Sequence, residues 1–329
     1  MRDTMGYLRL DDLHVAQIGT GRVGRPTAYT ILCAGLAGTM TVCDTKPGLA
    51  SAFAEELRHV VVSLGLDVNI NSCEKDEDVY DADIILVSAG KPRVPGVNMD
   101  RRDLAKENAE VVKQVSEATA PRNRRAKYVV ITNPVDSMAM ICKKYSKADV
   151  VISTGTYLES LRFRSELAKS LEVPASKVRG WVGGEHGDMA AILWSTAKAF
   201  DFPAEVYATS KGRTVDKKII ESRVNEVSRF IIDEIGGTEY GPAASFRDIV
   251  RAMIKDTREI FPIATPFRFE ELPEPVFVSI PTSVGWSIGT PLYEPLYYEE
   301  KKKIAEAARA IYRTYKEAVL SLEDGTARS

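Results

Sequence analysis

Short apolar runs rich in β-branched residues alternate with segments of helical periodicity through the first half of the chain. The runs have the length of strands, whereas the periodic segments repeat their apolar positions every three or four residues. The expected strands are residues 13–18, 39–43, 68–71, 84–88, 128–132 and 150–153, and the expected helices are residues 24–36, 49–64 and 104–120. Strands that alternate with helices in this way predict a doubly wound parallel α/β sheet with both faces covered.

The second half of the chain has a different pattern, in which helices dominate. The expected helices are residues 157–171, 215–235, 243–254 and 299–322, and the strand-like segments are residues 178–182, 190–195 and 276–281. A mixed α+β domain is therefore expected to follow the parallel sheet, with the chain divided into residues 1–153 and 154–329. No Gly/Ser-rich linker separates the two halves, so we expect them to pack together.

Composition and charge exclude several classes of function. Apolar residues make up 44% of the chain, charged residues 27%, and the formal net charge is −2, which is the balance of an ordinary globular protein. This charge favours neither nucleic acid nor an anionic membrane as a partner. There is no apolar run long enough to span a membrane and no secretory signal, so we expect a soluble, cytoplasmic protein.

The cysteines give no sign of a metal site or of disulfides. Four are present, none in CxxC spacing: Cys33, Cys43, Cys73 and Cys142. Because three of them lie in or beside apolar runs, we interpret them as buried free thiols in a reducing compartment.

A glycine-rich turn, Gly19-Thr20-Gly21-Arg22-Val23-Gly24, follows the first expected strand and opens the first expected helix. In this context the first glycine allows a tight turn, the second lets a pyrophosphate approach the backbone, and the third lets helix pack on strand. The phosphates would meet the free N–H groups at the positive end of the helix. The pattern predicts a Rossmann dinucleotide site whose cofactor-binding residues are Gly19, Gly21, Arg22, Val23 and Gly24.

Asp44 strengthens that prediction. It lies 20 residues beyond Gly24, at the end of the next expected strand, where a carboxylate accepts hydrogen bonds from the adenosine ribose and repels a 2′-phosphate. The alternative is that Asp44 only caps the following turn. Together the two features favour NAD over NADP.

Only His186, of three histidines, lies in a setting that suits catalysis. His14 falls in an expected strand and His59 in an expected helix, so both are interpreted as structural. His186 is flanked by glycines in Gly184-Glu185-His186-Gly187-Asp188, a loop position from which an imidazole can reach a cleft. Hydride transfer to a ketone requires a proton for the forming alkoxide, and histidine supplies one near neutral pH.

Glu159 and Arg162 are the candidate companions of His186. They are three residues apart in an expected helix, so their side chains project from one side of it. A carboxylate there can orient a protonated imidazole, and an arginine can hold a substrate carboxylate through two parallel bonds. The alternative is an ordinary ion pair on the helix surface.

Five segments in order resemble the lactate/malate dehydrogenase family. They are the glycine-rich turn at 19–24, Thr132-Asn133-Pro134-Val135-Asp136, the His186 turn, residues 281–289 before a long terminal helix, and Thr238-Glu239-Tyr240-Gly241-Pro242-Ala243, which is similar to archaeal malate dehydrogenases in particular. The resemblance implies a role for each matching residue. His186 would be the acid/base catalyst, Glu159 its partner, Arg162 the carboxylate clamp, Asn133 a substrate hydrogen-bond donor, Arg101 the group that polarises the carbonyl, and Arg93 the reader of the substrate's far end.

Two departures from the family pattern stand out. Glu159 replaces the family's aspartate, and its extra methylene lengthens the reach toward His186 by roughly 1.5 Å. The loop from Lys91 to Asp103, which resembles the family's closing loop, is two residues longer between Arg93 and Arg101 than in the usual malate pattern. Arg102 is therefore the alternative to Arg93.

The resemblance implies an NAD-dependent malate dehydrogenase that interconverts oxaloacetate and (S)-malate, with L-lactate or another 2-hydroxy acid as the alternative substrate. A homo-oligomer, dimer or tetramer, is the expected assembly, with no nucleic-acid or membrane partner and no metal. NAD-dependent glycosidases need a metal-binding cysteine and histidine cluster, and no cysteine accompanies His186. A non-catalytic NAD-binding protein would not need the histidine and both arginines.

Overall fold

The computed structural model describes residues 12–91 and 101–326, except for the side chains of residues 101–103 and 324–326. The first half of this part forms the predicted parallel sheet, with strands in the doubly wound order β3-β2-β1-β4-β5-β6. The strand bounds are β1 His14–Ile18, β2 Thr39–Cys43, β3 Asn69–Cys73, β4 Ile84–Val87, β5 Lys127–Val130 and β6 Val151–Ser153. β1 pairs in parallel with both of its neighbours, with Ile18 opposite Cys43 of β2 on one side and Val87 of β4 on the other. The predicted fold class is confirmed.

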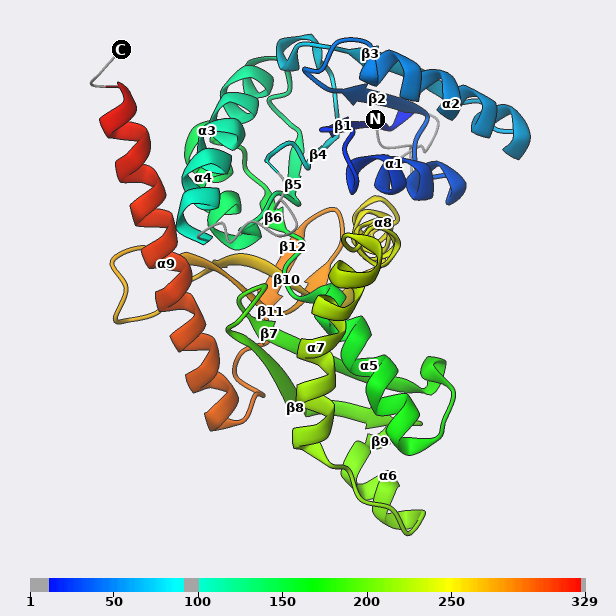
Figure 1. The fold of residues 1–329 in the computed structure, drawn as a ribbon, viewed down its shortest axis with the longest axis vertical. Helices are drawn as coiled ribbons and strands as arrows, with labels where there is room; N and C mark the ends of the chain where they lie inside the picture. The colour runs from blue at the N-terminus through cyan, green and yellow to red at the C-terminus, as the bar shows by residue number, and fades with distance from the viewer. Residues whose placement is uncertain (1–11, 92–100, 327–329) are drawn as a thin grey trace.

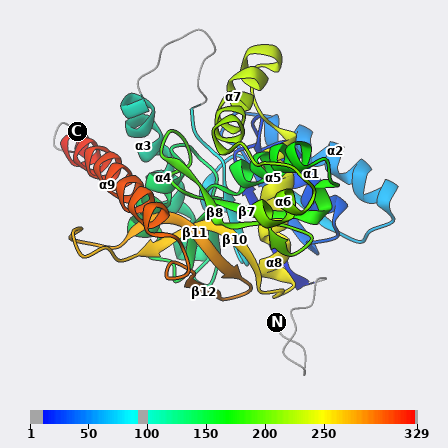
Figure 2. The same ribbon diagram turned by 90° about the horizontal axis from the view of Figure 1, so that it is seen from below.

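Helices cover both faces of this sheet, as Figures 1 and 2 show. On one face lie α1 (Gly24–Cys33) and α2 (Leu49–Leu64), and on the other α3 (Arg101–Thr119) and α4 (Val135–Ser146). Because successive residues of a strand point to opposite faces, Val15 packs in the core beneath α1 and α2 while Ala16 packs beneath α3 and α4. Burial on both faces explains why these strands read as continuous apolar runs.

The same sheet continues into the second half with antiparallel strands in the order β10-β11-β7-β8-β9 after β6. Their bounds are β7 Val178–Gly184, β8 Ala190–Ala199, β9 Phe202–Pro203, β10 Glu259–Phe267 and β11 Val276–Val284, with β12 Ile288–Pro291 paired to β11. The helices are α5 Tyr157–Leu171, α6 Ala204–Ser210, α7 Lys217–Ile235, α8 Tyr240–Ile254 and α9 Tyr298–Thr326. The two halves therefore share one sheet, and they pack together as the absence of a linker predicts.

Two helices of the second half bind it to the first. The long α9, red in Figure 1, runs along the side of the molecule and packs against α3 and α4. On the opposite side α8 packs against α1. Within the described residues, no helix combines the length and the apolar character needed to cross a bilayer.

The sequence prediction missed α4 and β10. Most of α4 is buried, including the run from Val135 to Cys142, so it lacks the polar face on which helical periodicity depends. In β10, Pro262 and Pro266 interrupt the apolar run, and prolines within a run argue against assigning it as a strand. The short α6, β9 and β12 were also absent from the prediction.

Candidate active site

His186 lies in the turn between β7 and β8, and glycines allow that turn to be tight. Gly184 has φ +89°, and a Cβ there would lie 2.6 Å from the Met189 carbonyl oxygen. The turn is fixed at His186 itself, whose backbone N–H donates to Asp136 Oδ2 at 2.9 Å. The imidazole retains access to solvent, with 26% of its side-chain surface exposed.

Glu159, near the start of α5, faces the imidazole. His186 Nδ1 lies 3.1 Å from Glu159 Oε1 and 3.2 Å from Oε2, and the glutamate side chain is 10% exposed. The longer side chain therefore still reaches the histidine. Because Nδ1 is occupied by the carboxylate, Nε2 is the ring nitrogen positioned to exchange a proton with a substrate.

Arg162 completes this group from the next turn of α5. Its Nη1 lies 3.7 Å from Glu159 Oε1, and its side chain is 12% exposed. The contact is thus a partly buried ion pair beside a histidine, and the alternative of a surface pair does not hold. At 3.7 Å the pair is too long for a strong hydrogen bond, which leaves the guanidinium fork able to bind an anion.

The charges in this group shift one another's pKa values. Burial lowers the pKa of His186, but the Glu159 carboxylate outweighs it, together with Asp136, so that the pKa of His186 rises above its ordinary value. Burial raises the pKa of Glu159, yet the charge and hydrogen bond of His186, with Arg162, bring it below its ordinary value. The site therefore favours an imidazolium paired with a carboxylate.

Asp136 is a site residue that the sequence analysis did not assign. It lies in the first turn of α4, is 2% exposed, and accepts hydrogen bonds from Ser153 Oγ at 2.7 Å and from the His186 amide. Burial raises its pKa, while these hydrogen bonds act in the opposite direction. The sequence did offer one sign of a role for Asp136, which is its position directly after Asn133-Pro134-Val135. That position does not indicate that the Asp136 carboxylate binds the backbone of a turn 50 residues away.

The glycine-rich turn has the shape of a phosphate cradle. Gly19 has φ +86°, and a Cβ there would lie 2.5 Å from the Ala89 amide nitrogen, while a Cβ on Gly24 would lie 1.9 Å from the Gly19 carbonyl oxygen. At Gly21, in contrast, a Cβ would meet nothing within 4 Å. The first and third glycines are thus required by packing, whereas the second faces open space at the positive end of α1, which has no acidic residue in its first turn.

Asp44 is fixed at the end of β2 beside this turn. Its Oδ2 accepts hydrogen bonds from the Thr20 amide at 2.8 Å and the Thr20 hydroxyl at 3.0 Å. Its Oδ1 accepts from the Lys46 amide at 3.0 Å, so the turn-capping role is present as well. The carboxylate joins the glycine-rich turn to the strand where a ribose is expected.

Of the other two residues of the turn, Val23 directly precedes α1 and is half-buried, and Arg22 points to the second half of the chain. Arg22 Nε lies 3.3 Å from Glu239 Oε1, and Nη1 donates to the Ile235 carbonyl at 3.4 Å. Its side chain therefore ties the cofactor turn to α7 and α8.

Asn133 follows β5 with an exposed residue surface, and its carbonyl accepts a 2.7 Å hydrogen bond from Asn108 Nδ2. Asn108 is 1% exposed, and its Oδ1 also accepts from the Lys91 amide at 2.7 Å. This buried amide, which the sequence analysis missed, connects the start of the loop to the Asn133 segment.

The loop arginines are only partly within the described residues. Arg93 lies outside them, and so does the fallback Arg102 in its side chain. Arg101 begins α3, and its side chain is likewise not described. The structure therefore places His186, Glu159, Arg162 and Asn133, but not the contacts of the loop residues.

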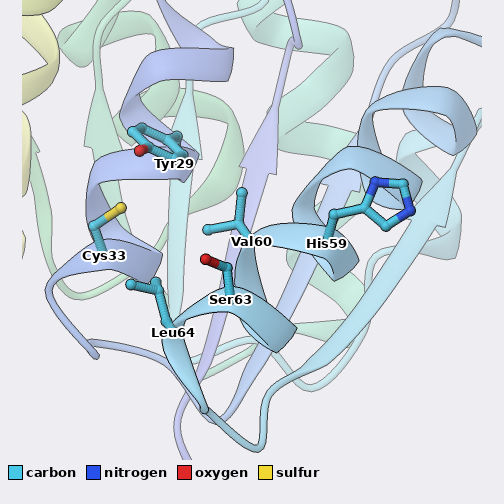
Figure 3. Close-up of a pocket in the computed structure, with 6 residues that line it drawn as sticks. All are labelled: Tyr29, Cys33, His59, Val60, Ser63 and Leu64. Carbon is cyan, nitrogen blue, oxygen red and sulfur yellow. The ribbon is translucent and has the colours of Figure 1, made fainter.

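The remaining histidines and cysteines lie elsewhere. His14 bonds Thr41 Oγ1 at 2.8 Å, and His59 lines a hollow between α1 and α2 with Tyr29, Cys33 and three other residues (Figure 3). Cys43 and Cys142 are buried as predicted, but Cys33 is exposed because it faces that hollow rather than the sheet. Among the described residues, no group of three or more histidine, cysteine or acidic side chains has the arrangement of a metal site.

Two segments of the chain match the two domains of one known protein family. Residues 13–151 match the NAD-binding domain of lactate/malate dehydrogenases, and residues 156–320 match the α/β C-terminal domain of the same family. The chain belongs to the lactate/malate dehydrogenase family. Its cofactor is NAD(H), and the open space at Gly21, the positive end of α1 and the fixed Asp44 carboxylate suit that cofactor.

Members of the family differ in their similarity to this chain. The malate dehydrogenases of Sulfolobus acidocaldarius and Sulfurisphaera tokodaii are 36% and 37% identical to it over 309 residues, which are 94% of this chain and 98% and 97% of theirs. The crystal structure of a minor L-lactate dehydrogenase from Enterococcus mundtii superposes with a TM-score of 0.86 at 26% identity, covering 93% of this chain and 98% of that one.

We expect replacement of Asp44 by serine to reduce the preference of this family member for NADH over NADPH. Removing the carboxylate removes both a ribose acceptor and the repulsion of a 2′-phosphate, so the ratio of the two Kd values should fall about tenfold, the effect of one charged hydrogen bond. Fluorescence titration with each cofactor measures it. Asp67→Ser, on an exposed residue, is the control, and an unchanged ratio in Asp44→Ser would remove Asp44 from cofactor selection.

Proposed function

We propose that this protein is an NAD-dependent malate dehydrogenase that interconverts oxaloacetate and (S)-malate. The observation that carries the proposal is the contact of His186 Nδ1 with the buried Glu159 carboxylate at 3.1 Å, with Arg162 beside it. The similarity to two malate dehydrogenases at 36% and 37% identity favours malate as the substrate. L-lactate remains the alternative because the family includes both enzymes.

His186 serves as the acid and base of the reaction. Bound NADH would supply the hydride. The imidazolium of His186 donates its Nε2 proton to the forming alkoxide. Glu159 holds the ring by Nδ1 and stabilises its positive charge, while Asp136 fixes the backbone of the turn. In the oxidation of malate the neutral imidazole accepts the hydroxyl proton.

Arg162 positions the substrate by its carboxylate. A planar guanidinium forms two parallel hydrogen bonds with a carboxylate and fixes the direction from which the keto carbon meets the cofactor. Asn133 would donate a hydrogen bond to the substrate, and Arg101 would polarise the keto oxygen. Arg93 pairs with the second carboxylate of oxaloacetate, because burying that anion without a cation would cost several kcal/mol.

We also propose how the enzyme is divided into domains, where it acts and how it assembles. Residues 1–153 constitute the NAD-binding domain and residues 154–329 the substrate domain. The enzyme acts in the cytoplasm as a homo-oligomer. It catalyses the malate oxidation step of the tricarboxylic acid cycle. The division of the sheet into parallel strands up to Ser153 and antiparallel strands beyond it supports the domain boundary. Comparison of NADH oxidation with oxaloacetate and with pyruvate tests the substrate, and oxaloacetate is expected to be the better one.

The pH dependence of the reaction should report the pair of Glu159 and His186. Reduction of oxaloacetate needs protonated His186, so activity falls as pH rises through the pKa of this histidine. Since Glu159 raises that pKa, Glu159→Gln should move the fall in activity to lower pH, although Asp136 and Arg162 still face the ring.

The pH profile of kcat/KM measures this shift. Glu166→Gln is a matched control on the same helix, because Glu166 is 12% exposed and pairs with Lys169 and Arg223 instead. A Glu159→Gln profile that overlays that of the unmodified enzyme would refute the role of Glu159.

A further inference from the structure

Two cysteines lie directly opposite each other at the edge of the parallel sheet. The register of β2 and β3 pairs Cys43 with Cys73, and β3 is the edge strand. Residues paired across parallel strands point to the same face, and both side chains belong to the core beneath α3. Their thiols are therefore neighbours.

The spacing of these residues suits a disulfide. Adjacent strands lie about 4.7–4.9 Å apart, and the Cα atoms of disulfide-bonded cysteines are usually about 4.4–6.8 Å apart. Cys43 is fully buried, whereas Cys73 is partly exposed. An oxidant therefore reaches Cys73 first, with Cys43 waiting behind it.

A carboxylate stands beside the buried thiol. The Cys43 thiol donates a 3.7 Å hydrogen bond to Asp76 Oδ1. Burial raises the pKa of Asp76 above its ordinary value, which makes its carboxylate a better proton acceptor. The hydrogen bond with Cys73, and then burial, raise the pKa of the Cys43 thiol, so that this thiol needs such a base.

The backbone of the same two cysteines holds the cofactor site. The Cys43 carbonyl accepts the Gly19 amide at 2.9 Å, and the Cys73 carbonyl accepts the Asp44 amide at 3.2 Å. A disulfide most often holds its two Cα atoms about 5.5–6 Å apart, which is wider than the spacing of about 4.7–4.9 Å between adjacent strands. Closing it therefore spreads the ends of β2 and β3, where Cys43 and Cys73 are paired. The glycine-rich turn and Asp44 then lose the positions that the reduced protein gives them.

We propose that Cys43 and Cys73 form a reversible disulfide, with a peroxide as oxidant, that weakens NAD(H) binding. The Cys73 sulfur attacks one peroxide oxygen and the O–O bond breaks. The Cys73 thiol proton passes to the departing hydroxide, which leaves as water, and Cys73 becomes a sulfenic acid. The Cys43 sulfur then attacks the Cys73 sulfur, the S–O bond breaks, and the Cys43 proton passes through Asp76 to the departing hydroxide as water. Two thiols are oxidised and one peroxide is reduced to two waters.

The test uses the full-length Cys33→Ser protein, which lacks the exposed thiol on α1 (Figure 3). After treatment with hydrogen peroxide, peptide mapping without reduction should give a linked pair containing Cys43 and Cys73, two hydrogens lighter than the separate peptides. The Kd for NADH, from fluorescence titration without substrate, should rise about tenfold, the effect of one lost hydrogen bond to a charged group. Dithiothreitol should reverse both changes.

Cys73→Ser in the same background keeps the shape of the edge strand and removes the accessible thiol. It should give no linked peptide and a Kd for NADH that peroxide does not change. Cys142, which is buried in α4, should stay reduced throughout and serves as the internal control.

Three results would overturn the proposal: no Cys43–Cys73 link, a link with an unchanged Kd, or a weakened Kd that dithiothreitol does not restore. Because the readout is cofactor binding in the absence of substrate, it is independent of whether malate or lactate is the substrate.

Discussion

Replacement of His186 by asparagine is expected to lower turnover by about two to four orders of magnitude, the usual worth of a positioned acid or base. Asparagine is close in size and polarity but cannot hold or release the proton. The backbone contact with Asp136 does not involve the side chain, so the turn and the cofactor site should persist. Steady-state kinetics and NADH titration should therefore show a large loss of kcat with an unchanged Kd for NADH.

His59→Asn is the control for this substitution. His59 is exposed on α2 and lines the hollow in Figure 3 rather than the catalytic group, so its replacement should leave kcat near that of the unmodified enzyme. If His186→Asn kept near-normal turnover, the acid/base role would have to be assigned to another group.

Replacement of Arg162 by lysine should raise the KM for the keto acid by about a hundredfold, the scale of a lost charged hydrogen bond pair. Lysine keeps the positive charge beside Glu159, but its ammonium is a point charge that cannot form two parallel bonds with a carboxylate. The measurement is KM for the keto acid at saturating NADH.

Arg179→Lys provides the control, because Arg179 is exposed and its nearest ion-pair partner is Asp201 at 3.8 Å. It should leave KM unchanged. A normal KM in Arg162→Lys would mean that the guanidinium does not bind the substrate.

Local patterns predicted the parts of this protein whose structure depends on neighbours in sequence. The bounds of residues 39–43, 49–64 and 157–171 agree with β2, α2 and α5, because each has a clear period and a turn at its ends. The glycine-rich turn was predictable for the same reason, since strand, turn and helix follow one another. Glu159 and Arg162 were placed together by helical spacing alone.

Features that depend on contacts between residues far apart in the chain could not be predicted from the sequence. The Asp136 carboxylate accepts a hydrogen bond from the backbone of a turn 50 residues away. Asn108, which follows the loop in sequence, forms hydrogen bonds with the backbone of both Lys91 and Asn133. Neither partner can be read from a local period. The buried helix α4 and the proline-containing strand β10 gave no amphipathic signal, and their positions are set by the shared sheet and its covering helices.

The proposed substrate of this site is a dicarboxylic keto acid. The most direct test measures NADH oxidation by the purified protein with oxaloacetate and with pyruvate side by side, at the same pH, salt and cofactor concentration. We expect kcat/KM for oxaloacetate to exceed that for pyruvate by about a hundredfold or more, since the second carboxylate gains a charged partner in the site. A higher kcat/KM for pyruvate would contradict the malate assignment and identify a lactate dehydrogenase instead.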